Sequence, residues 1–327
     1  MILAAVLRSG SIVAAAEPDE KSVTVAADGS GNFKTIQEAV AAASGPTTIH
    51  IGAGEFRGPI IIPKDKPCIT LIGAGPNKTI ITWNRNVYEK IPPGSDKFNP
   101  GVQVRGEDFR AEDLTIQNTA GDHGQALALR IDSDRAVLRH CRLLGWQDTM
   151  MVNDGRQYFY LCYIEGRVDF IYGSGTAVFD HCEVHSKNGG YLTAASTSPE
   201  HTFGFVFLDC KLTGDEVPWD PATTNPATTQ KAAKPNKLAY LGRPWRPYAS
   251  VAFIHCDMGD HIRPAGWSNW GKASNEQTAQ YSEFGSTGPG GNTDKRVPWA
   301  KELTAEEAAQ YTIARILGGS DYWDPTE

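Results

Sequence analysis

The sequence lacks any run of 18 apolar residues, any excess of basic residues and any C-x-x-C pair. Without a long apolar run, no segment predicts a membrane span. Lys and Arg number 31 against 38 Asp and Glu, a formal net charge of −7. This balance argues against a nucleic-acid partner, because proteins that bind nucleic acid usually present a basic surface. The six cysteines, without C-x-x-C spacing, give a zinc or redox site no local support.

The composition favours a folded protein with many turns. Hydrophobic residues make up 40% of the 327 residues, and 33 glycines and 20 prolines punctuate them. This is too apolar for a disordered chain, and the length suits one elongated domain. A polyanionic partner would need a local cluster of Arg and Lys to attract it, since the whole chain is acidic.

The first 16 residues resemble the end of a secretory signal. They finish in Ala14-Ala15-Ala16, a small-residue cleavage region. The start carries no basic residue, and Arg8 interrupts the apolar stretch. We interpret residues 1–16 as a signal peptide remnant and expect a secreted or periplasmic protein. The alternative is a disordered N-terminal tail.

Five of the cysteines lie in one repeated pattern, an apolar stretch, a cysteine and a second apolar stretch. The segments are VLRHCRLLG, YFYLCYIEG, VFDHCEVHS, FVFLDCKLTG and VAFIHCDMGD. The earlier FRAEDLTIQN fits with Asp113 in the cysteine position. From Asp113 to Cys256, successive positions are separated by 28, 21, 20, 28 and 46 residues. Periods of about 20–30 residues predict an all-β solenoid, in which equivalent residues stack at about 4.8 Å.

The segments outside the repeats predict a loop and two end helices. The 46-residue separation contains DEVPWDPATTNPATTQKAAKPNK, which indicates an exposed loop beside the coils. TIQEAVAAAS predicts a short helix that caps one end of the solenoid and covers its edge strand. LTAEEAAQYTIARILGG predicts a second helix, with a capping box at Thr304 and Glu307 and a stop at Gly318. We expect one domain, over residues 22–324.

Two aspartates share the cysteine register. Asp148 lies seven residues after Cys141, and Asp169 lies seven residues after Cys162. If the cysteines stack, the aspartates also stack, with backbones about 5 Å apart. Stacked carboxylates repel, so one pKa should rise, and a solenoid that needed only stability would rarely place them together. The alternative is a pair of turn aspartates in solvent.

The strings around these aspartates, LLGWQDTMMV and GRVDFIYGSG, are apolar and aromatic. They predict a cleft of low dielectric around the pair, lined by Trp146, Met150, Phe170 and Tyr172. In such a cleft an ionised carboxylate can attack a carbonyl while a protonated one gives its proton to the leaving group.

Three further polar residues can support this chemistry. Gln147 adjoins Asp148, Gln125 lies in HGQALALR, and either amide N–H can stabilise an oxyanion. Arg243 in LGRPWRP can hold a carboxylate by a two-point contact. Taken singly, each of these is more often a surface or packing residue.

The sequence resembles the pectinesterase (pectin methylesterase) family. The strings that carry the resemblance are GQALALR, GWQDTM, RQYFYLCYIEGRVDFIYGSGTAVF and LGRPW, in the family's order, and weaker similarity covers nearly all of the chain. The resemblance implies a right-handed parallel β-helix with short capping helices. It also implies hydrolysis of the methyl esters of galacturonate units in methylated homogalacturonan, with no metal and no cofactor.

The resemblance also implies a role for each matching residue. Asp169 would be the nucleophile, Asp148 the general acid and then base, Gln147 and Gln125 the oxyanion donors, and Arg243 the partner of Asp169. The predicted substrate-binding residues are Trp245, Phe170 and Trp267. A family cysteine pair would correspond to a Cys162–Cys182 disulfide, whose alternative is a stack of free thiols. We expect a monomer.

Two departures and three alternatives stay open. KFNPGVQV stands where the family usually has a small-residue strand with a substrate-contacting threonine, and GGYLTAAST looks bacterial rather than plant-like. The alternatives are another pectin-cleaving β-helix, a related thioesterase, and an inactive polysaccharide-binding β-helix. An inverting hydrolase would hold its carboxylates about 6.5–9.5 Å apart, farther than the predicted stacking allows.

Overall fold

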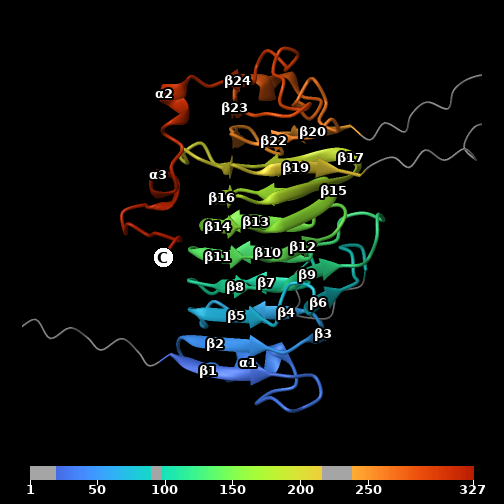
Figure 1. The fold of residues 1–327 in the computed structure, drawn as a ribbon, viewed down its shortest axis with the longest axis vertical. Helices are drawn as coiled ribbons and strands as arrows, with labels where there is room; N and C mark the ends of the chain where they lie inside the picture. The colour runs from blue at the N-terminus through green and yellow to red at the C-terminus, as the bar shows by residue number, and fades with distance from the viewer. Residues whose placement is uncertain (1–19, 90–96, 216–237) are drawn as a thin grey trace, which may run out of the picture.

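The computed structural model describes residues 20–89, 97–215 and 238–327, which form one stack of coils (Figure 1). Each coil contributes short strands to two large sheets, and every pairing within the sheets is parallel. Parallel strands with both faces covered favour continuous Val, Ile, Leu and Phe, which is what the repeats supply. The expected parallel β-helix is confirmed.

The first sheet is 11-stranded and runs the length of the stack. In spatial order its strands are β1 (Lys21–Val25), β2 (Thr47–Ile51), β5 (Ile69–Gly73), β8 (Arg110–Glu112), β11 (Ala136–Arg139), β14 (Arg156–Tyr160), β16 (Thr176–Asp180), β18 (Phe205–Leu208), β21 (Ser250–Ile254), β23 (Gln280–Phe284) and β24 (Lys301–Glu302).

The second sheet is 13-stranded and branches. Its main path is β3 (Gly54–Arg57), β6 (Thr79–Trp83), β9 (Thr115–Asn118), β12 (Arg142–Leu144), β15 (Tyr163–Gly173), β13 (Met150–Asp154), β10 (Leu129–Asp132), β7 (Val102–Val104) and β4 (Ile60–Ile62). The branch contains β17 (Glu183–Ala195), β19 (Lys211–Gly214), β20 (Ala239–Gly242) and β22 (Asp257–Met258). The long β15 joins two arms of this sheet, because its first residues pair with β12 and its last with β13.

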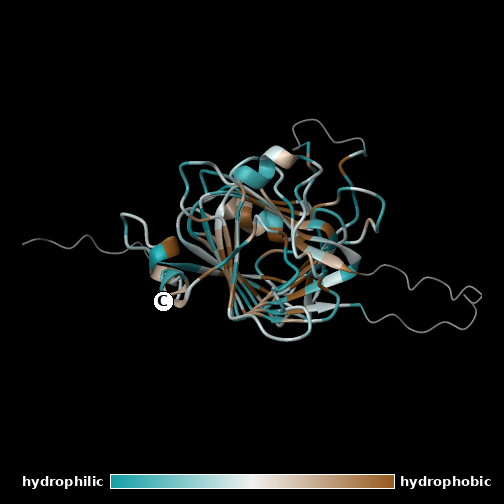
Figure 2. Cartoon of the chain, turned by 90° about the horizontal axis from the view of Figure 1, so that it is seen from above, coloured by the Kyte–Doolittle hydropathy of each residue, from teal (hydrophilic) through white to brown (hydrophobic). Residues whose placement is uncertain are grey.

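The interior is a column of stacked apolar side chains. Figure 2 shows the coils around it, viewed down the long axis of the stack. Phe159, Phe179, Phe207 and Phe253 stack on successive coils, with ring centroids 4.8, 4.5 and 4.4 Å apart. Repeated identical side chains therefore supply both the buried apolar area and the contact between coils.

The cysteines form a second column, which we call the thiol column: Cys141, Cys162, Cys182, Cys210 and Cys256. All six cysteines of the chain are free thiols, so the structure shows the stack rather than the expected Cys162–Cys182 disulfide. The Sγ atom of Cys162 points at the Leu138 carbonyl, and that of Cys182 at the Phe159 carbonyl. Each thiol thus satisfies a backbone acceptor on the preceding coil.

The assignment of Asp113 to the cysteine position is wrong by one residue. Glu112 pairs with Arg139, and Arg142 pairs with Thr115, so Leu114 takes the place of Cys141. Asp113 lies one residue earlier, at a corner where it adopts a positive φ of 54°. Leucine fills the interior position there because an inward carboxylate would be buried without a partner.

The N-terminal helix agrees with the sequence, whereas the C-terminal segment differs. Helix α1 (Ile36–Ala42) begins at a capping box of Thr35 and Glu38 and packs against β1, β2 and β4. The expected single C-terminal helix is two short ones, α2 (Ala305–Ala308) and α3 (Ile313–Leu317), with the capping box at Thr304 and Glu307 as expected.

These two helices lie along the side of the stack instead of covering its end (Figure 1). The first sheet carries outward apolar side chains, among them Val137, Val178 and Val206, and Ile316 and Leu317 cover them. The helices therefore bury a second apolar cluster outside the coils. A single-turn 3-10 helix, η2 (Ala273–Gln277), completes the helical elements that the described ranges contain.

Two sequence interpretations lie outside the described residues: the signal remnant at 1–16 and most of the polar loop, at 216–237. The domain boundary of 22–324 stays a prediction. Within the described ranges, no helix has the length and apolarity needed to cross a bilayer.

Candidate functional site

Asp148 and Asp169 lie side by side on neighbouring coils, as the cysteine register predicts. The backbone of Gln147 pairs in parallel register with Gln125 on one coil and with Val168 on the next. Asp148 and Asp169, which follow Gln147 and Val168, are therefore stacked. Both aspartates adopt the left-handed backbone conformation, with φ of 61° and 52°. Asp adopts this conformation more readily than most non-glycine residues, and other corners of the coils, such as those at His140 and Leu161, adopt it too.

The bend in β15 places Asp169. The register of β15 against β17 shifts on both sides of Val168, where the strand passes from one ladder to the next. Gly166 makes the bend possible, because a Cβ there would lie 2.2 Å from Phe170 Cβ. Asp169 and Phe170 then face opposite sides, the aspartate into the cleft and the ring into the core.

Arg243 grips Asp169 with two parallel hydrogen bonds. Its Nε donates to Oδ1 at 2.8 Å and its Nη2 to Oδ2 at 2.7 Å. The guanidinium lies between Tyr191 and Trp270, with Cζ 3.9 and 3.8 Å from the two ring centroids. This two-sided stacking fixes the plane of the guanidinium, and hence the orientation of the carboxylate.

Asp148 is held by amides instead of a cation. Gln125 Nε2 donates to Asp148 Oδ2 at 2.9 Å, and the Gln147 side chain also hydrogen-bonds to this carboxyl group. Each amide nitrogen carries two N–H groups, so each glutamine keeps a donor for a second acceptor in the cleft.

The two carboxyl groups differ in the pH at which they ionise. Burial, and then the charge of Asp169, raise the pKa of Asp148 to about 8. Burial also raises the pKa of Asp169, but the hydrogen bonds and charge of Arg243 offset part of that rise, so Asp169 ionises first. Only 4% of Asp148 and 7% of Asp169 is exposed. Near neutral pH the pair therefore consists of one carboxylate and one carboxylic acid.

The cleft above the pair has aromatic walls and a polar floor. Its lining residues are Phe98, Gln125, Gln147, Asp148, Asp169, Tyr172, Ala194, Arg243, Trp245 and Trp270. Trp245 packs edge-on against Tyr172, with centroids 5.8 Å apart. Arg243 and Trp245 face the same cleft, as extended alternation across Pro244 predicts. Aromatic faces beside a carboxyl pair suit a sugar ring carrying an ester.

Two predicted substrate-binding residues do not reach the cleft. Phe170 is 0% exposed and belongs to the interior column. Trp267 is 1% exposed, packs 4.3 Å from Tyr281, and donates its Nε1–H to Glu283 Oε1 at 2.9 Å. Two other residues that were expected to line the cleft also lie outside it. Met150 is buried in the core, and the ring of Trp146 stacks on Lys187.

The sequence interpretation missed Phe98, Tyr191 and Trp270. Trp270 follows Trp267 by three residues in GWSNWG, and its positive φ of 61° turns it into the cleft. The sequence alone does not show which of these two nearby tryptophans faces the cleft and which faces the core. Phe98 lies in KFNPGVQV, the segment that departs from the family pattern, and its aromatic ring was the available signal.

Comparison with known proteins settles the family. Residues 22–320 match the family model described as Pectinesterase. The chain belongs to the pectinesterase family. It is similar to Pectinesterase 31 of Arabidopsis thaliana, with 39% identity over 305 residues that cover 89% of this chain and 90% of the relative. It is also 39% identical to Pectinesterase/pectinesterase inhibitor 3 of the same plant, of which it spans only 51%.

Solved pectinesterases share the fold. A pectin methylesterase from carrot superimposes with a TM-score of 0.81 at 33% identity, covering 96% of each chain. One from Erwinia chrysanthemi gives 0.76 at 26% identity, covering 94% of this chain and 99% of its own. A third, solved in complex with a hexasaccharide, gives 0.75 at 27% identity, covering 93% and 98%. The plant proteins share more identity with this chain, so its expected bacterial character gains no support here.

Proposed function

We propose that this pectinesterase hydrolyses the methyl esters of galacturonate units in pectin, releasing methanol, through an aspartyl acyl-enzyme. The observation that carries the proposal is the pairing of two buried carboxyl groups, one gripped by Arg243 and the other not. Nucleophilic attack on an ester needs a carboxylate and an acid side by side, and this pair supplies both near neutral pH.

In the first half-reaction, Asp169 attacks the ester carbonyl carbon and a C–O bond forms. The carbonyl electrons move onto oxygen, and the remaining N–H groups of Gln125 and Gln147 stabilise that oxyanion. The oxyanion collapses, the bond to the methoxy group breaks, and Asp148 gives its proton to the departing oxygen. Methanol leaves, and Asp169 is joined to the substrate as a mixed anhydride.

In the second half-reaction, Asp148 is a carboxylate and acts as a base. It takes a proton from water, whose oxygen attacks the anhydride, and Asp169 leaves as a carboxylate again. One proton of this water reprotonates Asp148, and the other stays with the hydroxyl group that joins the acyl carbon. The product therefore forms as a carboxylic acid, which releases that proton to solvent and becomes a galacturonate carboxylate. The cycle needs no redox change and uses only water as co-reactant.

The cleft walls favour a galacturonate chain as substrate. Trp245 and Phe98 offer apolar faces to sugar rings, next to the polar floor. A related pectin methylesterase is known in complex with a hexasaccharide. A thioesterase of the same family could use the same pair, but flat aromatic walls favour a sugar over an acyl chain. A binding protein without activity would have no use for a carboxyl pair that costs stability.

Methanol release from highly methylated pectin tests the proposal. Asp169→Asn keeps the shape and tolerates the positive φ, but loses the nucleophile, so we expect activity to fall at least a thousandfold. Asp113→Asn is the matched control, because Asp113 also has a positive φ but lies outside the cleft, and it should leave activity unchanged. Wild-type levels of methanol from Asp169→Asn would refute the mechanism.

We also infer that the protein is secreted and acts as a monomer. A cell-wall polymer is reached only outside the cell, and Ala14-Ala15-Ala16 offers a cleavage region. Mass spectrometry of the N-terminus of protein recovered from the medium or periplasm tests secretion, and light scattering tests the mass. A chain that starts at Met1 and stays inside the cell would contradict the inference.

A further inference from the structure

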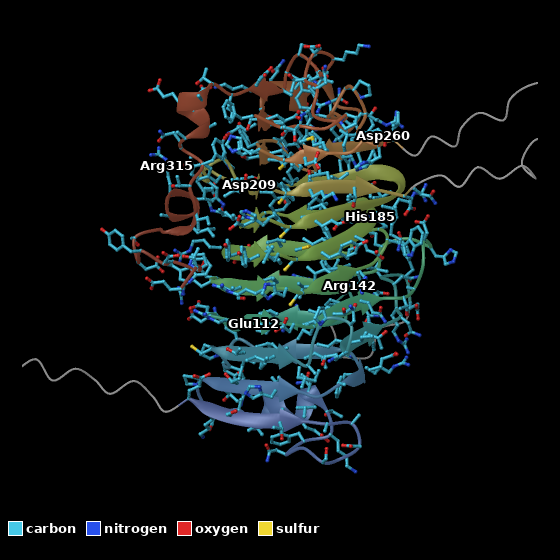
Figure 3. The ribbon with its side chains drawn as sticks, viewed as in Figure 1. Glu112, Arg142, His185, Asp209, Asp260 and Arg315 are labelled. Atoms are coloured by element: carbon cyan, nitrogen blue, oxygen red, sulfur yellow. The ribbon has the colours of Figure 1, made fainter. Side chains whose placement is uncertain are left out.

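A cluster of three metal-binding side chains lies outside the catalytic cleft. Asp180, His181 and Asp209 each place one ligand atom within 4.8 Å of those of the other two. Asp180 ends β16, His181 follows it, and Asp209 follows the end of β18 on the next coil. None of the three lines the cleft. Figure 3 labels Asp209, which lies on the opposite half of that view from His185.

The corner geometry of the coils brings the three side chains together. Asp180 pairs with Leu208, so His181 and Asp209 occupy equivalent positions on neighbouring coils. Both have a positive φ, 52° and 50°, which turns their side chains out of the strand direction. Both are exposed, so small side-chain rotations can close the cluster around an ion.

Asp180 is the least solvated member of the cluster, with 8% of the residue exposed. Its Oδ2 accepts a hydrogen bond from the Tyr158 hydroxyl at 2.6 Å, and its Oδ1 lies 2.6 Å from His181 Nδ1. Among the described residues its one ion-pair partner is His181, which is charged only when protonated. A buried carboxylate without a permanent cation favours the binding of one.

We propose that Asp180, His181 and Asp209 form a binding site for a divalent transition-metal ion, of which Zn²⁺ is the representative. One imidazole nitrogen and two carboxylate oxygens suit zinc and its neighbours, whereas Ca²⁺ takes six to eight oxygens. Zinc bonds of about 2.0–2.2 Å would replace the short contact between Asp180 and His181. Tyr158 would orient Asp180 from behind, as outer partners of metal ligands do.

The site would add a metal-mediated connection between two coils that already meet through strand pairing and through side-chain contacts such as that of His185 with Asp215. Asp180 and His181 come from the coil of β16, and Asp209 comes from the coil of β18. An ion bound by all three stabilises the folded chain by an amount that grows with the logarithm of the free-ion concentration above Kd, because the unfolded chain does not hold the ligands together. The site serves stability rather than catalysis, so ester hydrolysis should not depend on it.

Calorimetric titration of the chelator-treated full chain with Zn²⁺ tests the proposal, with thermal unfolding as a second readout. We expect one site in the wild type, and affinity at least tenfold lower in His181→Gln and in Asp209→Asn. His140→Gln is the matched control: His140 has the same corner position and a positive φ of 50°, but among the described residues its one ion-pair partner is Asp113, at 3.9 Å. This control should bind zinc like the wild type.

Other outcomes would overturn the proposal. Zinc binding that survives both His181→Gln and Asp209→Asn places the ion elsewhere, and equal binding of Ca²⁺ and Zn²⁺ removes the imidazole from the ligand set. A wild type that binds no zinc at millimolar concentration also refutes the site. Methanol release by the metal-free variants confirms that they are folded, because both altered residues are exposed and neither lines the cleft.

Discussion

The thiol column and the carboxyl pair come from the same coil spacing but have opposite energetics. Cys141 and Cys162 stack on neighbouring coils, and seven residues later Asp148 and Asp169 do the same. Stacked thiols are apolar and each satisfies a carbonyl, so repetition stabilises that corner. Stacked carboxyl groups repel, and burial together with this repulsion raises the pKa of Asp148 to about 8.

The comparison shows that a repeat fixes geometry, whereas the side chains decide what the geometry does. Every coil of a parallel β-helix brings equivalent residues within one strand spacing. Apolar residues turn this proximity into a core. Two acids turn it into a proton donor beside a nucleophile, at a cost in stability. Arg243 reduces that cost through its charge at both acids and through hydrogen bonds at Asp169 alone.

The largest expected effect comes from removing the asymmetry between the two acids. Arg243→Ala takes away the cation that keeps Asp169 ionised and oriented, so kcat should fall about a thousandfold. Arg243→Lys should rescue little, because an ammonium cannot make the two-point contact or stack between Tyr191 and Trp270. Steady-state kinetics on methylated pectin measures both, and near-normal kcat in Arg243→Ala would contradict the asymmetry.

A smaller effect is expected at the wall of the cleft. Trp245→Ala removes an apolar face that contacts substrate and transition state nearly alike, so KM should rise about tenfold with little change in kcat. Tyr322→Ala is a suitable control, because Tyr322 is an aromatic residue that is 88% exposed and lies outside the cleft. A loss of kcat at unchanged KM in Trp245→Ala would assign the tryptophan to the chemistry instead.

The smallest expected effects are on the free energy of unfolding. They should have opposite signs in the thiol column and at the carboxyl pair. Cys162→Ala leaves a small void in a packed column and should destabilise the protein by about 1–2 kcal/mol at all pH values. Asp148→Asn should stabilise it at alkaline pH by at least about 1 kcal/mol.

The pH dependence of that stabilisation follows from the raised pKa. Between the ordinary pKa of Asp, near 3.8, and about 8, the folded protein keeps a proton that the unfolded chain releases. Wild-type stability therefore falls as pH rises through this window, whereas Asp148→Asn carries no such dependence. Thermal unfolding at pH 4 and pH 9 measures the difference, which should be near zero at pH 4. Destabilisation by Asp148→Asn at pH 9 would contradict the claim that the ionised form of Asp148 destabilises the folded protein.

The sequence predicts the repeat and the register more reliably than it predicts which side chains face inward. Cysteine spacing alone stacks Asp148 on Asp169, because a seven-residue offset is the same on both coils. It cannot place Phe170 or Trp267, since the positive φ at Asp169 and at Trp270 interrupts regular alternation. The position of Asp113 was wrong by one residue because a polar corner residue and an inward leucine adjoin.

Long-range packing also escapes the sequence. The outward apolar stripe of the first sheet has no local signal that it needs a cover, so α2 and α3 were expected at the end of the stack. The Arg243 grip comes from a residue 74 positions away from Asp169. The resemblance to the family, and not periodicity, pointed to that pair.

Infrared difference spectroscopy tests the central claim that Asp148 holds the proton while Asp169 is ionised. The wild type at pH 6 should show the carbonyl stretch of a protonated, buried carboxylic acid, and the band should disappear with a midpoint near pH 8. Asp148→Asn should lack this band throughout, and Asp169→Asn should lose it at lower pH than the wild type, because the charge that helps to raise the pKa of Asp148 is gone. A band that survives in Asp148→Asn and vanishes in Asp169→Asn would contradict the account.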